Sequence, residues 1–144
     1  MKLKRLLKIT EQEFYDHIEK EFIQNFKDCT GTEIEISDFK KGLSYVQTSK
    51  KNPAGTTYTV TNYTRGVSYA VEARSIADTF SLFYETNPVE KGLEVTLHQT
   101  VASFNKSAHN KLMGALSEGI YLGRMSDVLY GIQNKIIDSR IKAK

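Results

Sequence analysis

The segment that most constrains the fold is Tyr121 to Ile141, because its apolar residues recur with the spacing of one long amphipathic helix. At 100° per residue, six apolar side chains share one stripe of this helix. They are Tyr121, Met125, Val128, Leu129, Ile132 and Ile136. A stripe of this length needs an extended apolar surface to cover it, and we therefore interpret the rest of the chain as the structure that holds this helix.

A second, smaller apolar group lies on the opposite side of the same predicted helix and consists of Tyr130, Ile137 and Ile141. A helix that only lies on a sheet should be polar there. Exposed apolar groups of this size often mark contacts between proteins. We predict a homodimer through this patch. The alternative is that another helix, a terminus or a loop covers it.

The N-terminal residues predict a strand followed by a helix. Apolar and polar residues alternate between Leu3 and Ile9, which is typical of a strand with one buried face. Thr10 and Glu13 then have the spacing of a capping box. The predicted helix runs from about Glu11 to Asp28 and ends at Thr30-Gly31.

From Glu33 to Val101 the apolar period is two, which indicates a run of strands. The predicted strands are Glu33 to Ile36, Leu43 to Gln47, Thr56 to Asn62, Val67 to Ala73, Thr79 to Thr86 and Leu93 to Val101. Short turns join them, so we expect an antiparallel meander of seven strands once Leu3 to Ile9 is included. Phe104 to Leu116 looks helical, and we predict a break or bend near Gly119 before the long helix.

Composition favours one soluble domain that covers residues 1–144, with 40% hydrophobic and 26% charged residues. The net charge of +3 is a weak indication of nucleic-acid binding, and we expect no nucleic-acid partner. The single cysteine, Cys29, excludes an internal disulfide and favours a reducing cytoplasm. No apolar run approaches the ~20 residues of a membrane span, and no signal-peptide core follows the basic N-terminus. We therefore predict a cytoplasmic protein without a membrane partner.

The predicted order is strand, helix, six antiparallel strands and a long C-terminal helix, and it covers the whole chain. This α+β order resembles the helix-grip fold of the START and Bet v 1-like (SRPBCC) superfamily. The Lys-rich first strand, the Asn105–Leu116 segment and the following helix also look like a small bacterial family of unassigned function within it. The resemblance implies a curved sheet around the long helix, with a cavity between them. Members bind lipids, hormones or polyketides, and some are cyclases or hydrolases, so the fold does not choose among these functions.

Motifs for catalysis or metal binding are weak. The sequence has no Gly-rich phosphate loop, and His17, His98 and His109 lack the spacing of a metal site. We assign no catalytic residue, no metal and no cofactor. Whether the protein is an enzyme stays open at this stage.

Polar residues on predicted inward faces are the best candidates for a binding site. Gln99 shares a face with Leu93, Val95 and Leu97; it either anchors a ligand or reaches backbone or water near the strand end. Inward tyrosines offer an apolar body with a polar tip, although they can equally serve cross-strand packing. The predicted ligand-binding residues are Tyr45, Tyr58, Tyr69, Gln99, Tyr121 and Met125.

We expect these residues to line an apolar pocket between the Leu93–Val101 strand and the Tyr121–Ile136 helix. The function predicted from the sequence is binding of a small apolar or amphipathic ligand. One alternative is an interaction protein with a filled core that acts through its surface, and another is an enzyme of cyclase or hydrolase type.

Overall fold

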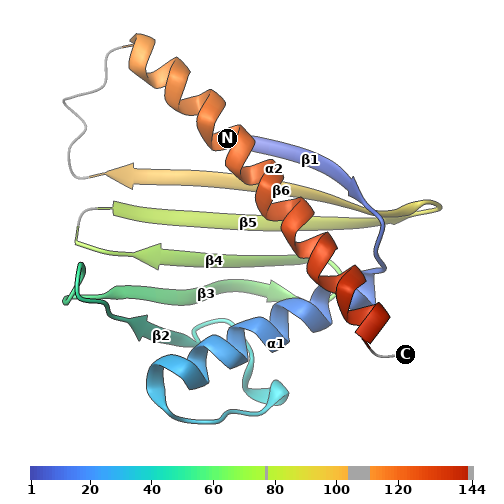
Figure 1. Cartoon of the computed structure of the whole chain (residues 1–144), viewed down its shortest axis with the longest axis horizontal. Coiled ribbons are helices and arrows are strands. Elements are labelled where there is room, and N and C mark those ends of the chain that lie inside the picture. The colour runs from blue at the N-terminus through green and yellow to red at the C-terminus, as the bar shows by residue number, and fades with distance from the viewer. Residues whose placement is uncertain (77, 104–110, 143–144) are drawn as a thin grey trace.

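The computed structural model describes the backbone of residues 1–76, 78–103 and 111–142, and the side chains of 1–76, 78–101 and 123–142. Within these ranges the chain forms a six-stranded sheet and two long helices (Figure 1). The elements are β1 (Lys2–Leu7), α1 (Glu11–Thr30), the 3-10 turn η1 (Ile36–Asp38), β2 (Ser44–Gln47), β3 (Thr56–Thr64), β4 (Ser68–Arg74), β5 (Asp78–Val89), β6 (Gly92–Ser103) and α2 (Lys111–Lys142).

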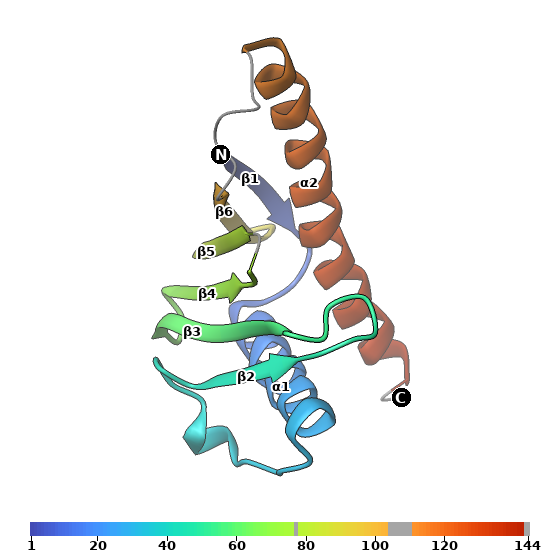
Figure 2. The same cartoon turned by 90° about the vertical axis from the view of Figure 1, so that its left-hand side faces the viewer.

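The sheet is antiparallel, with the strand order β1-β6-β5-β4-β3-β2. Strands β2 to β6 form a meander, and β1 adds to its far edge, where Leu3 pairs with Leu97 and Leu7 with Leu93. Figures 1 and 2 show α2 crossing the sheet diagonally near β1 and β6, whereas α1 lies toward β2 and β3. The antiparallel meander predicted from the sequence is confirmed.

Local hydrogen bonds explain where α1 begins and ends. The Thr10 hydroxyl accepts a hydrogen bond from Glu13 N at 3.1 Å, and the Glu13 carboxylate accepts one from Thr10 N at 2.9 Å. This is the predicted capping box. At the other end Gly31 has φ 74°, a left-handed conformation that favours glycine, and its N–H donates to Lys27 O.

The predicted strand at Glu33 to Ile36 is wrong. The chain there leads into η1, where Asp38 accepts a hydrogen bond from Glu35 N at 3.0 Å, and Ile36 is 66% exposed. This short alternating run has no buried face, so its pattern did not specify a strand. The sheet therefore has six strands and not the predicted seven.

The predicted break near Gly119 is also wrong, because α2 is one helix from Lys111 to Lys142. Glycine lowers helix propensity by about 1 kcal/mol without ending a helix. The predicted helical start at Phe104 lies outside the described residues. No helix in the described ranges is both long and apolar enough to cross a membrane.

The half of the sheet near β6 is filled by aliphatic side chains. Leu93, Val95 and Leu97 point inward and are fully buried. Met125 and Leu129 of α2 belong to the same buried cluster, which confirms this part of the predicted helix stripe. The half near β2 to β5 is lined instead by aromatic side chains, and it is less completely filled.

Candidate functional site

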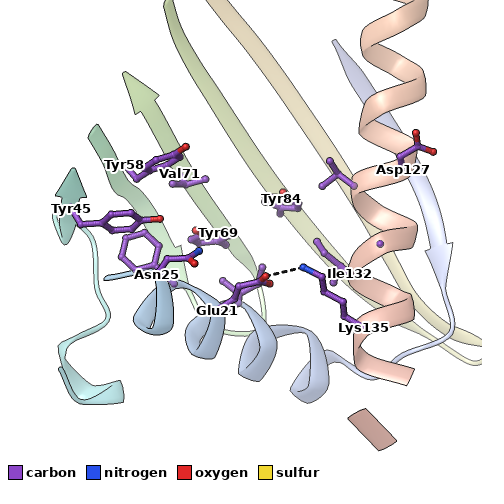
Figure 3. Close-up of a pocket in the computed structure, with 14 residues that line it drawn as sticks. Glu21, Asn25, Tyr45, Tyr58, Tyr69, Val71, Tyr84, Asp127, Ile132 and Lys135 are labelled. Carbon is purple, nitrogen blue, oxygen red and sulfur yellow. Dashed lines mark hydrogen bonds and ion pairs between the residues drawn. The ribbon is translucent and has the colours of Figure 1, made fainter. Parts of the chain in front are cut away.

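A pocket of about 400 Å³ lies between α1, α2 and strands β2 to β5 (Figure 3). Its sheet wall consists of Tyr45, Tyr58, Tyr69, Val71 and Tyr84. Its helix walls consist of Ile18, Glu21, Phe22 and Asn25 from α1 and Asp127, Val128, Gly131, Ile132 and Lys135 from α2. The two helices meet near the C-terminal end of α2 and diverge from there (Figure 1). The pocket occupies the space that opens between them.

Four tyrosines form the floor as two cross-strand pairs. Tyr45 of β2 is directly opposite Tyr58 of β3, and their rings stack with centroids 5.2 Å apart. Tyr69 of β4 is directly opposite Tyr84 of β5, and their rings stack at 5.7 Å. The antiparallel register therefore brings together residues that are far apart in the sequence.

Three of the floor tyrosines, Tyr45, Tyr69 and Tyr84, are neutral hydrogen-bond donors at neutral pH. Burial raises the pKa of Tyr45 to about 12, and the neighbouring Tyr58 adds to this shift. Burial also raises the pKa of Tyr84 to about 12 and that of Tyr69 still further. A phenol with such a pKa keeps its proton, so the floor is apolar except for O–H groups.

An ion pair closes the pocket where the helices meet. Lys135 Nζ of α2 donates to Glu21 Oε1 of α1 at 3.0 Å (Figure 3). His17 Nε2 lies 2.7 Å from Glu21 Oε2, but its N–H is poorly aligned for a hydrogen bond, and burial lowers the pKa of His17. The imidazole is therefore neutral at neutral pH, and Lys135 is the cation that pairs with Glu21.

Glu21 and Lys135 also line a second hollow of about 380 Å³ on the outer side of the two helices. This outer groove is lined by His17, Lys20, Glu21, Gln24, Lys135, Asp138, Ser139 and Lys142. Because the same two side chains line both spaces, the ion pair forms the wall between the pocket and the outer groove.

The structure brings together three of the six predicted site residues. Tyr45, Tyr58 and Tyr69 line the pocket. Gln99 and Met125 point inward and are buried, but they lie outside the pocket lining. The side chain of Tyr121 lies outside the described residues. The pocket therefore lies over β2 to β5, because aliphatic side chains fill the expected space beside β6.

Several lining residues were not found from the sequence. Tyr84 is directly opposite Tyr69, so the register between β4 and β5 would have identified it. Glu21 and Asn25 are spaced by four residues, which places them on one line along α1 beside the apolar stripe. Such a line is usually a solvated helix edge, and only the position of α2 makes it a pocket wall.

The described residues contain no group of three or more His, Cys, Asp and Glu side chains that could hold a metal ion. His98 is far from His17 and pairs with Glu85 at 2.6 Å. His109 lies outside the described residues. Besides tyrosines, the ionisable groups that line the pocket are Glu21, Asp127 and Lys135, of which Glu21 and Lys135 pair with each other.

Solved structures identify the class of fold. Ara h 8.0201 is similar with a TM-score of 0.62 at 7% identity, over 96% of this chain and 97% of that one. TTHA0849 from Thermus thermophilus is similar with a TM-score of 0.62 at 10% identity, over 96% and 97% of the two chains. CV1439 from Chromobacterium violaceum has a TM-score of 0.59 at 14% identity, over 94% and 95%. At such identities the likeness establishes the fold alone, which is the Bet v 1-like helix-grip fold.

The chain belongs to the family DUF3284, described as a domain of unknown function, whose model matches residues 1–118. This confirms the predicted membership of a family without an assigned function. No curated protein matches the sequence.

Proposed function

We propose that this protein binds a small, mainly apolar ligand in the pocket between α1, α2 and strands β2 to β5. The observation that carries the proposal is the pocket itself, whose volume of about 400 Å³ falls in the range of known small-molecule sites. Its walls are largely aromatic and aliphatic. A few polar groups at fixed positions would orient the ligand, as in most such sites.

An unfilled pocket favours this binding function over an interaction protein with a filled core. A cytoplasmic location is part of the same proposal, because the only cysteine, Cys29, is free and exposed.

Two glycines of α2 offer a matched pair of variants to test the proposal. A Cβ added at Gly131 or at Gly123 would meet no atom within 4 Å, so both sites accept a larger side chain. Gly131 lines the pocket and Gly123 does not. Gly131→Leu should therefore fill the pocket, whereas Gly123→Leu leaves it open and makes an equivalent change to the same helix.

The measurement is equilibrium dialysis of the full chain against 2-ethylnaphthalene, an apolar probe without an acceptor oxygen. We expect the unmodified protein and Gly123→Leu to bind the probe equally. Gly131→Leu should bind at least about tenfold more weakly, since the added side chain occupies the ligand's space. Equal binding by all three proteins, or no binding by any, would reject the proposed pocket. Native mass spectrometry of freshly purified protein would show a co-purified ligand directly.

A further inference from the structure

We propose that Tyr69 and Tyr84 form a donor pair that selects ligands with an uncharged acceptor oxygen, such as a ketone or ester carbonyl. This inference rests on the proposed binding function and names the chemical class of its ligand. It starts from the position of the pair. Both side chains line the pocket from the central strands β4 and β5, and they are only 5% and 4% exposed (Figure 3).

The geometry of the pair places two tyrosine rings side by side on the sheet wall of the pocket. The two rings stack with centroids 5.7 Å apart and an interplanar angle of 20°, and they project from directly opposed residues. Directly opposed residues of neighbouring antiparallel strands project from the same face of the sheet, so both rings enter the pocket from one wall. A ligand oxygen at about 2.8 Å from one of these hydroxyls can accept a hydrogen bond from it.

The hydroxyls of this pair differ from those of two other tyrosines in the same aromatic cluster. Tyr15 shares a hydrogen bond with the Thr86 hydroxyl at 2.7 Å, and Tyr63 donates to the Glu19 carboxylate. Tyr69 and Tyr84, by contrast, form no side-chain hydrogen bond with any residue in the described ranges. A hydroxyl that forms no such bond within the protein is available to donate to a ligand oxygen in the pocket.

The electrostatics favour an uncharged oxygen over a carboxylate. Burial raises the pKa of both tyrosines, so they act as donors and not as phenolates. Glu21, Asp127 and Lys135 are the charged side chains of the pocket lining, and their formal charges sum to −1, which makes the local potential negative. The negative charge of Glu21 also raises the pKa of Tyr84 further. A carboxylate would be repelled by this potential, whereas a neutral carbonyl accepts the hydrogen bonds without that penalty.

The test compares three probes of the same ring size in equilibrium dialysis: 2-acetonaphthone, 2-ethylnaphthalene and 2-naphthoate. Tyr69→Phe and Tyr84→Phe each remove one hydroxyl and keep the ring. We expect each variant to bind the ketone roughly 3- to 10-fold more weakly than the unmodified protein does. Its affinity for the hydrocarbon should stay unchanged. Tyr130→Phe is the control, because it removes the hydroxyl of a half-exposed side chain outside the pocket. It should change the affinity for neither the ketone nor the hydrocarbon.

Three results would overturn the donor pair. The first is that the ketone and the hydrocarbon lose affinity by the same factor in Tyr69→Phe and Tyr84→Phe. The second is that the ketone keeps its affinity. The third is that 2-naphthoate binds more tightly than the ketone and loses affinity in Tyr69→Phe and Tyr84→Phe. The two hydroxyls would then select an anionic ligand. If the hydrocarbon binds and Gly131→Leu weakens its binding, the proposed binding function is supported even when the donor pair is rejected. If no probe binds, both fail.

Discussion

Lys135 of α2 and Glu21 of α1 form a 3.0 Å ion pair that is the common wall of the inner pocket and the outer groove. The two residues are 114 positions apart in the chain, so only the packing of the two helices brings them together. Their side chains are 65% and 43% exposed, and such pairs are weak. The wall is therefore easy to open.

We predict that Lys135→Met speeds entry of a ligand into the pocket. The variant loses the ion pair that links α1 to α2 at the wall of the pocket. The free energy of unfolding should change by less than about 1 kcal/mol. The measurement is the association rate of 2-ethylnaphthalene from stopped-flow tyrosine fluorescence. Lys142→Met is the control, since Lys142 lines only the outer groove. An association rate equal to that of the unmodified protein would show that ligands enter elsewhere.

Gly131→Ala and Gly123→Ala should each stabilise the protein. Both glycines lie within α2, and an added methyl group meets no neighbouring atom. Alanine exceeds glycine in helix propensity by about 1 kcal/mol, which for a domain of this size corresponds to a melting temperature higher by about 2–6 °C. Differential scanning calorimetry checks the prediction. A lower melting temperature for either variant would mean that α2 requires glycine at that position.

Gln99→Leu should leave binding of both the ketone and the hydrocarbon within about twofold of the unmodified protein. Gln99 is buried on the inner face of β6, where its backbone N–H donates to Met1 O at 2.8 Å, and it does not line the pocket. Equilibrium dialysis with both probes checks this outcome. A selective loss of ketone affinity would extend the binding site toward β6 and restore the amide as a ligand anchor.

Glu13 should make the fold sensitive to acid. Hydrogen bonds from Arg140 hold the pKa of Glu13 at about 2, well below its ordinary value of 4.5. A folded-state pKa below the unfolded one gives stability that is fully present above the unfolded pKa. This contribution is lost as pH falls from about 4.5 to about 2.

The measurement is urea unfolding of the unmodified protein and Glu13→Gln at about pH 6 and about pH 3. The stability advantage of the unmodified protein should shrink by on the order of 1 kcal/mol at the lower pH. Glu90→Gln is the control, because Glu90 is exposed and forms no ion pair with the residues that the structure describes. An advantage that is independent of pH would show that Glu13 stabilises α1 without its charge.

We propose that Tyr130, Ile137 and Ile141 mediate a homodimer. Tyr130 and Ile141 are 40% and 70% exposed, and Ile137 lies between them on the same stripe of α2. Multi-angle light scattering should show a dimer for the unmodified protein and a monomer for Ile137→Lys. Exclusively monomeric unmodified protein at high concentration would contradict the proposal.

The position of the pocket shows why sequence patterns locate elements more reliably than sites. The period-two runs identified the six strands found in the described residues, but the short run at Glu33 to Ile36 had the same pattern without a buried face. The inward face of β6 was also identified, because alternation assigns faces within one strand. The pattern did not show that aliphatic side chains fill the space beside that face, so Gln99 and Met125 were expected in a pocket that lies elsewhere.

The sequence by itself determined the features that depend on neighbouring residues. The capping box of Thr10 and Glu13, the end of α1 at Gly31 and the apolar stripe of α2 follow from contacts within a few positions. Only the tertiary structure decided that Tyr69 stacks on Tyr84 and that Lys135 reaches Glu21. These relationships depend on strand register and on the crossing of two helices, which arise when the whole core packs at once.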